Sequence, residues 1–419
     1  MDETILRRFF IVVTLVLLLA VSGVIGVLAA DWPFYKRLFN LPYGAAELPD
    51  SFYQPVVAIE GAPAQFFPEA APDQRSIGEQ TLQDATNWAA ANGTLALLVL
   101  HRGHVQLERY WQGMSGDTLY SGGAMSRSLL GFAFGFARAD GAIRSLDEPL
   151  ETWLDEWQGE SRGKITLRDL LHNLSGLEEM ALPPVGESPR AAMLQRVLAR
   201  VKPLYSKDTR LLLDEDFAHA ALAFNLVHEP GTRFAVSDAN AQLLGVILER
   251  ATHTDYERYI DAKLWRPLGA GRAEFYMDRA NGMPAVYCCF RATPRDWLRL
   301  GTLFLNDGTL GGRRVLPRGW IHELTTTSRV NPLYGMQVWA GKAPAGLRES
   351  IPGSHQGVLH GEPYLANEVM WMEGGGRTIW AIPSEELVIV RLGPATRDWD
   401  GSFLPNTILR GLLNRKAAP

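Results

Sequence analysis

An uncharged apolar run near the N-terminus constrains this 419-residue chain more than any other feature. From Phe9 to Ala30 the sequence reads FFIVVTLVLLLAVSGVIGVLAA, without a charged residue. As a helix this run would extend about 33 Å, enough to cross a hydrocarbon core of about 30 Å. Arg7 and Arg8 precede it, and such cations favour the cytoplasmic side of a membrane. The run therefore predicts a membrane-spanning helix whose short N-terminus lies in the cytoplasm.

A secretory signal peptide is the alternative reading of the same residues. The small residues in Val27-Leu28-Ala29 or Leu28-Ala29-Ala30 would suit a cleavage site. Signal h-regions usually run about 7–15 residues, however, and this run is longer. We therefore expect residues 1–8 to be cytoplasmic, residues 9–30 to be a signal-anchor, and the rest of the chain to be extracytoplasmic, in the periplasm. Cleavage would instead give a secreted domain.

The segment that follows the run links it to the main domain. Residues 31–39 mix aromatic side chains with Lys36 and Arg37, a composition that suits either the lipid headgroup layer or the start of a linker. Residues 40–75 hold scattered prolines without sustained periodicity, which is typical of a tether or a surface arm. We assign residues 31–75 to a juxtamembrane segment and linker, and residues 76–419 to one domain.

The overall composition is that of a globular protein, with 47% hydrophobic and 21% charged residues. A net charge of −5 argues against a nucleic-acid partner, which would normally require a basic excess. The two cysteines, Cys288 and Cys289, are adjacent. Because neighbouring cysteines rarely pair and a framework needs more of them, a disulfide-stapled miniprotein and a cysteine zinc site are both excluded. The redox state of this pair stays open.

Two hairpin patterns lie near the two ends of the soluble part. Residues 94–100 and 104–110 flank Arg102-Gly103, and residues 377–382 and 387–392 flank a short polar turn. The sequence between and before them predicts helices at 77–91, 124–139, 166–174, 210–227, 238–251, 255–264 and 294–307. The pattern indicates an α+β fold in which an antiparallel sheet of both hairpins packs with a mainly helical region. Residues 178–228 are expected to form a helical insertion over the cleft.

The common metal, nucleotide and hydrolase motifs do not occur in this sequence. The pairs His101/His104 and His355/His360 lie in loops, and the sequence has no HExxH. It also lacks a Walker loop, a GxGxxG after a strand, and a GxSxG elbow. We therefore expect neither a metal nor a cofactor.

Five segments in order carry a family pattern, namely Tyr120–Ser128, Asp140–Pro149, Ile165–Leu177, Pro230–Gly245, and Leu264–Gly269 with the final hairpin after Gly374-Gly375-Gly376. Together they resemble the serine β-lactamase and penicillin-binding-protein-like hydrolases, the group that includes class C β-lactamases, over about residues 76–412. The resemblance implies a β-lactamase/transpeptidase-like fold. It also implies three motifs: Ser-x-x-Lys at a helix start, Tyr-x-Asn, and a strand motif before the last hairpin.

In this chain the three motif positions hold other residues. The first falls on Ala124-Met125-Ser126-Arg127, the second on Val236-Ser237-Asp238, and the third near Glu373-Gly374-Gly375. Acyl transfer needs an oxygen nucleophile, and an alanine offers only a methyl group. An arginine, with a pKa above about 12, cannot serve as the base, and a valine has no proton to transfer.

Losing one member of such a unit typically costs about 10⁴–10⁶ in rate. We therefore expect a catalytically inactive binding or scaffolding homologue whose ligand, by resemblance alone, is a peptide or a cell-wall fragment. Arg127 is expected to pair internally with Asp238, although an incoming carboxylate or phosphate would also satisfy it. The ligand-cleft candidates are Arg127, Asp238, Gly374, Gly375 and Gly376. The three glycines would permit close backbone approach to a ligand or bend the sheet edge.

Two other interpretations stay open. An active serine hydrolase would need a nearby nucleophile such as Ser126 or Ser121, although Ser126 would point about 200° away from residue 124 on a helix. A purely structural module that binds a partner would not use the cleft at all. Asp238 and Asn240 are expected to cap the helix that begins near them. The apolar residues between Leu129 and Phe136 are expected to form the core-facing side of the helix at 124–139. The oligomeric state is not predictable from these patterns.

Overall fold

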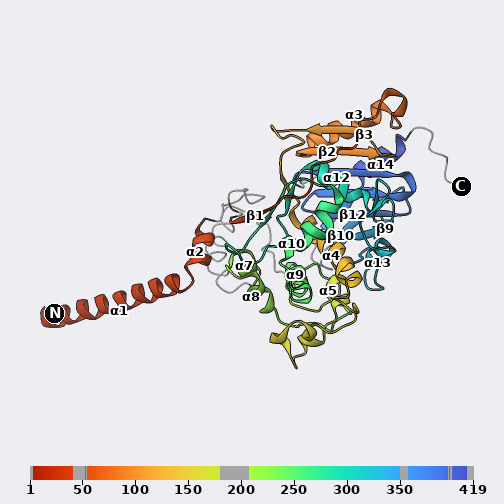
Figure 1. The fold of residues 1–419 in the computed structure, drawn as a ribbon. Coiled ribbons are helices and arrows are strands. Elements are labelled where there is room, and N and C mark those ends of the chain that lie inside the picture. The colour runs from red at the N-terminus through yellow and green to blue at the C-terminus, as the bar shows by residue number, and fades with distance from the viewer. Residues whose placement is uncertain are drawn as a thin grey trace.

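The computed structural model describes residues 3–40, 52, 54–179, 207–349, 357–394, 396 and 399–412. A long N-terminal helix, α1 (Glu3–Ala30), stands away from the folded domain, and a short helix, α2 (Trp32–Phe39), joins it to that domain (Figure 1). Within α1, residues Phe10–Ala30 have a mean hydropathy of 2.9, and none of them is buried in the protein. The helix is thus long and apolar enough to cross a membrane, as an anchor or as a signal sequence.

The centre of the domain is a six-stranded antiparallel sheet with the order β3-β2-β14-β13-β12-β9. Its strands are β2 (Ala96–His101), β3 (His104–Tyr110), β9 (Trp339–Gly341), β12 (Val369–Gly374), β13 (Arg377–Ile382) and β14 (Leu387–Leu392). Both predicted hairpins are present, and β2 pairs with β14, so that Leu98 lies opposite Val390. This confirms the expected α+β fold with a sheet that joins the two ends of the domain.

Helices cover both faces of this sheet, which explains why strand β2 is apolar throughout. Alternate side chains of a strand point to opposite faces. Leu97 and Val99 belong to a hydrophobic cluster with helices α3 (Glu79–Ala91) and α14 (Phe403–Arg410). Leu98 and Leu100 instead join the larger cluster, to which helix α12 (Pro294–Thr302) contributes.

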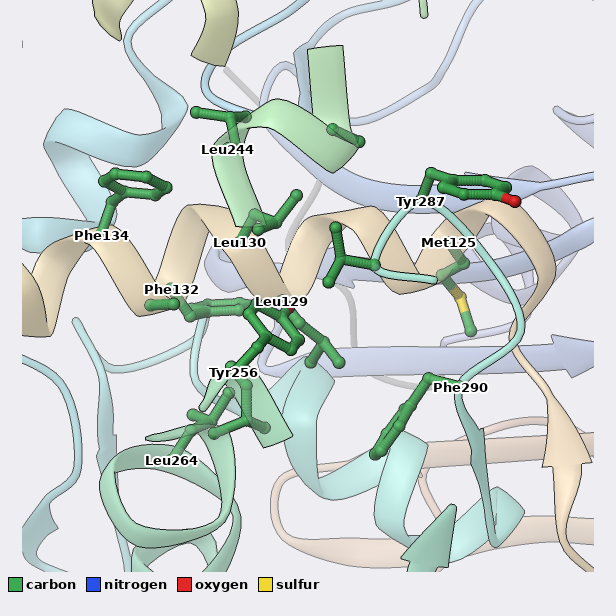
Figure 2. Packing of buried hydrophobic residues seen from close by; sticks show 14 of the residues in the cluster. Met125, Leu129, Leu130, Phe132, Phe134, Leu244, Tyr256, Leu264, Tyr287 and Phe290 are labelled. Atoms are coloured by element: carbon green, nitrogen blue, oxygen red, sulfur yellow. The ribbon is translucent and has the colours of Figure 1, made fainter. Parts of the chain in front are cut away.

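The helical region packs around one buried helix, α4 (Ser128–Ala139). Figure 2 shows α4 side chains such as Leu129 and Phe132 among residues from helix α9 (Asp238–Thr252) and helix α10 (Tyr256–Ile260). The apolar residues expected to form this core, Leu129, Leu130, Phe132, Phe134 and Phe136, are all buried. The other α-helices of the described residues are α5 (Leu167–Leu171), α7 (Lys207–Leu213), α8 (Phe217–Leu222), α11 (Arg266–Leu268) and α13 (Trp320–Thr325). A π-helical turn, η8 (Asp261–Trp265), follows α10.

A second, smaller sheet has the order β1-β5-β6-β4. Its strands are β1 (Val56–Ile59), β4 (Tyr120–Ser121), β5 (Ala273–Tyr276) and β6 (Arg291–Ala292). Two separate strand pairs are also present. They are β7 (Thr309–Leu310) with β8 (Arg313–Arg314), and β10 (Gly346–Glu349) with β11 (Gly357–His360). Because β1 pairs with β5, the segment assigned to a linker at residues 31–75 contributes a strand to the domain. Four apolar residues between prolines were too short a run to show strand periodicity.

One other expectation differs from the structure. The helix predicted at 210–227 is two helices, α7 and α8, because the Asp216 carboxylate accepts a hydrogen bond from the backbone N–H of His219 and caps α8. Residues 180–206 of the expected insertion at 178–228 lie outside the described residues. Cys288 and Cys289, whose redox state the sequence left open, form a disulfide. Cys289 adopts a left-handed backbone conformation with a φ of +74°.

Candidate functional site

The first site position lies on a 3-10 turn, η3 (Gly123–Arg127), which leads directly into α4. Ala124 is partly exposed on this turn and presents a methyl group. The two fallback serines are engaged in the local structure. The hydroxyl oxygen of Ser126, which is 2% exposed, accepts a hydrogen bond from the backbone N–H of Phe290 at 3.2 Å. That of Ser121 accepts one from the N–H of Gly123 at 3.2 Å.

Arg127 is held by two hydrogen bonds from its guanidinium group. Its Nε donates to the carbonyl of Ala124 at 3.0 Å, and its Nη2 donates to Oδ1 of Asp238 at 2.7 Å. Only 8% of Arg127 is exposed. Burial raises the pKa of the Asp238 carboxyl, while the charge and the hydrogen bond of Arg127 oppose that rise. The expected internal pair is therefore present, and it links the first motif to the second across the domain.

The second motif begins helix α9. Ser237 is the N-cap residue, and its hydroxyl accepts a hydrogen bond from the N–H of Asn240. The expectation that Asp238 and Asn240 cap this helix was therefore wrong. Asp238 is drawn to Arg127 instead, and the amide of Asn240 is bound by Ser175 and Asn173. A serine one residue earlier is an equally good cap in sequence, so the choice depends on these tertiary partners.

Val236 stands where the family has a tyrosine. Among the described residues, no hydrogen bond places the hydroxyl of another tyrosine at that position. Val236 is half-buried and packs against the hydrophobic cluster that includes Phe234 and Tyr334. The Tyr334 hydroxyl accepts a hydrogen bond from the Asn173 side chain at 2.9 Å and lies 3.3 Å from Oε1 of Gln337. Burial raises the pKa of Tyr334. This tyrosine was missed by sequence reasoning, because no motif marks it and only the fold brings it to Asn173.

The third motif lies at the end of β12, directly against Ala124. A Cβ atom placed on Gly374 would lie 2.2 Å from the backbone nitrogen of Met125 and 2.6 Å from that of Ala124. The glycine therefore permits close backbone approach, one of the two predicted roles, and the neighbour is the η3 turn of this chain. The Glu373 carboxylate binds Arg348 and the indole N–H of Trp371. The other two candidate glycines, Gly375 and Gly376, form the turn into β13 with positive φ angles.

We expect Gly374→Ala to lower the free energy of unfolding by about 2–3 kcal/mol, because the added methyl group meets rigid backbone rather than a flexible side chain. Gly78→Ala is the matched control, since a Cβ there meets its nearest atom at 3.7 Å, an ordinary contact. Denaturant unfolding of the full chain in detergent measures both. Equal effects of the two variants would contradict the close packing described above.

The described residues contain no group of three or more His, Cys, Asp and Glu side chains that could hold a metal ion. Two surface depressions, of about 460 and about 240 Å³, lie away from Ala124. The first is lined by residues that include Asp140 and Lys263, and the second by residues that include Phe66 and Arg272. At the site itself, η3 contacts the end of β12 at Gly374 and is joined to α9 by the Arg127–Asp238 pair.

Solved structures of other proteins share the fold described above. A class C beta-lactamase mutant superposes with a TM-score of 0.56 at 16% identity, covering 80% of this chain and 97% of that one. A penicillin-binding protein from Bacillus halodurans gives a TM-score of 0.52 at 13% identity, covering 79% and 98%. At these identities the likeness shows a shared fold only.

Comparison with known sequences points to the same group. A 6-aminohexanoate-dimer hydrolase of Paenarthrobacter ureafaciens is 29% identical over 190 residues, which are 40% of this chain and 42% of that protein. The match thus spans less than half the length of that relative. The family model described as Beta-lactamase matches residues 81–396, which include all three motif positions. The chain therefore belongs to the beta-lactamase family.

Proposed function

We propose that this chain is a membrane-anchored, extracytoplasmic member of the beta-lactamase family that has lost acyl-transfer chemistry and acts by binding or scaffolding. The observation that carries the proposal is the pair of substitutions at the start of α4. Where the family places a nucleophilic serine and a lysine base, this chain has Ala124 and an arginine that is paired with Asp238.

The chemistry of that pair leaves no route to an acyl-enzyme at this position. A methyl group has no lone pair with which to attack a carbonyl carbon. A guanidinium group carries only hydrogen-bond donors, so Arg127 cannot accept a proton from a nucleophile. Two of its nitrogens already donate to Ala124 and Asp238. The packing of Gly374 on the η3 turn keeps this arrangement compact.

The retained fold supports a binding role rather than no role. The family match spans the segments that frame the site, and the fold is shared with a class C beta-lactamase mutant, which supports a retained domain without the reacting groups. In the family this position meets peptides and cell-wall fragments, so a ligand of that class is the proposed partner. The apolar helix α1 would hold the domain at the outer surface of the membrane, where such ligands occur.

A second candidate, an active serine hydrolase, is favoured by the hydrolases among the relatives of this chain. It would have to use Ser121 or Ser126. Ser126 is buried, with its oxygen bound to the Phe290 N–H. Ser121 is half-buried, and its oxygen is bound within the η3 turn. Either serine would need the turn to rearrange before it could attack a substrate.

Labelling of the full chain in detergent with a fluorophosphonate and with a fluorescent penicillin separates the two candidates. We expect no covalent adduct by intact mass. Stoichiometric labelling that disappears with Ser126→Ala or Ser121→Ala, but persists with the exposed-surface control Ser115→Ala, would establish the hydrolase and overturn our proposal.

The triple variant Ala124→Ser, Arg127→Lys, Val236→Tyr is expected to gain ester hydrolysis, because it restores the nucleophile, the base and the proton carrier together.

A further inference from the structure

Helix α2 is fastened to the folded domain by one of its faces. Phe34 and Tyr35 are 0% and 6% exposed, and they form a cluster with Leu213 at the end of α7. Leu38 packs against the same cluster. A flexible linker would leave these rings in water, whereas their burial against the domain is favoured by the hydrophobic effect. The segment after α1 is therefore part of the domain surface.

Polar contacts fix the direction of α2 on that surface. The Arg37 guanidinium donates to the backbone carbonyls of Leu213, Asp214 and Asp278. The first two carbonyls lie at the C-terminal end of α7, where the helix dipole attracts a cation. At the other end of α2, Asp31 forms an ion pair with Arg210, whose guanidinium also lies 4.2 Å from the centre of the Phe34 ring. Because α2 is bound to the domain at both ends, it cannot rotate about either contact.

A second face of α2 is exposed and has a distinct composition. Trp32 and Phe39 are 52% and 65% exposed, and Lys36 lies between them and is also exposed. Residues 32, 36 and 39 follow the i, i+4, i+7 spacing that places side chains along one stripe of a helix. The stripe thus presents two aromatic rings and one cation on the side away from α7.

We propose that this stripe of Trp32, Lys36 and Phe39 lies in the phospholipid headgroup layer, so that α2 acts as a rigid strut that holds the domain at one orientation to the membrane. This inference rests on the proposed anchor, because only a spanning α1 brings α2 to the lipid. Trp32 comes two residues after Ala30, the end of the apolar helix, so it must then lie at the boundary between lipid and water. Aromatic rings are enriched at that depth, and a lysine there reaches lipid phosphates.

The strut determines which end of the domain is close to the bilayer. Because the docked face of α2 contacts α7 and the chain around Asp278, that end of the domain faces the lipid. The six-stranded sheet and α3 lie at the other end of the molecule (Figure 1). A ligand or partner of the domain would therefore meet the sheet end from the aqueous side.

Tryptophan quenching in lipid tests the exposed stripe. The full chain is reconstituted into phosphatidylcholine vesicles with and without brominated acyl chains. We expect the bromine-quenched part of the fluorescence to be lost with Trp32→Phe and to be retained with Trp88→Phe, a control in α3 at the far end of the domain. Identical quenching of the parent chain and Trp32→Phe would overturn the inference.

Hydrogen exchange in the same vesicles tests the docked face. Arg37→Ala is expected to increase amide exchange in residues 31–40 and 207–214, whereas the neighbouring Lys36→Ala leaves that exchange unchanged. Protection of β2 and β14 reports that each variant is folded. Exchange in residues 31–40 of the parent chain at the rate of an unstructured peptide would overturn the strut.

Intact mass separates this inference from the anchor on which it rests. A chain that retains residues 1–30 but shows no quenching of Trp32 would overturn the headgroup contact and leave the anchor in place. A chain from which residues 1–30 have been removed would overturn the anchor, and with it the position of α2 in lipid.

Discussion

Asp238→Ala should lower the free energy of unfolding by about 3–5 kcal/mol, because it leaves a buried arginine charge without its carboxylate. The side chains of Arg127 and Asp238 are only 10% and 20% exposed, so water cannot fully replace the lost partner. Denaturant unfolding of the full chain in detergent, followed by tryptophan fluorescence, gives the free energy. The effect should be among the largest for any single polar residue of the site.

Two variants make this result specific. Asp147→Ala removes a similar arginine contact at 2.6 Å, but its side chains are 42% and 64% exposed, and we expect a loss of less than about 1 kcal/mol. Combining Asp238→Ala with Arg127→Met should recover most of the stability, because it removes the unpaired charge as well. A double variant as unstable as Asp238→Ala alone would show that the charge is not the cause.

Arg391→Met should be similarly destabilising, by about 3–5 kcal/mol, since it leaves several buried carbonyl groups without donors. Arg391 is 0% exposed and lies on β14. Its guanidinium donates to the carbonyls of Asn92 at 2.6 Å and Gly376 at 2.8 Å, and its Nε donates to the Thr94 hydroxyl at 3.0 Å. The contact with Gly376 also connects this cluster to the glycine turn beside the site.

Arg391→Lys is expected to restore less than half of that loss, because an ammonium group cannot reproduce the planar fork of donors. The matched control is Arg109→Met on β3 of the same sheet, an exposed arginine that we expect to change stability by less than about 0.5 kcal/mol. Full rescue by lysine in the same unfolding measurement would show that charge alone, rather than hydrogen-bond geometry, is what the cluster requires.

The sequence predicts the framework of the fold well because its signals are local. Arg102-Gly103 marks the first hairpin, and the apolar spacing from Leu129 to Phe136 marks the buried helix, so both elements are present as expected. Strand β1 was not predicted, since its pairing partner lies more than two hundred residues away and its own four residues carry little pattern. The disulfide of Cys288 with Cys289 accompanies a left-handed backbone conformation at Cys289, which residue spacing alone does not reveal.

The site was predictable where one residue's chemistry demanded a partner. A buried arginine beside a family motif needs an anion, and Asp238 was the carboxylate at the matching position of the next motif. The role of Ser237 as the helix cap was not predictable, because Asp238 is as good a cap in isolation. Tyr334 and Arg391 gave no signal either, because only the fold brings their partners to them.

The pairing of β2 with β14 has a consequence for folding during synthesis. Leu98 and Val390 are opposite each other in the sheet although they are roughly 290 residues apart in the chain, and such non-local contacts form slowly. The early hairpin of β2 and β3 therefore leaves the ribosome with an unpaired, apolar edge that must wait for the last strand to be made. A chain of this topology therefore completes its central sheet only late in its synthesis.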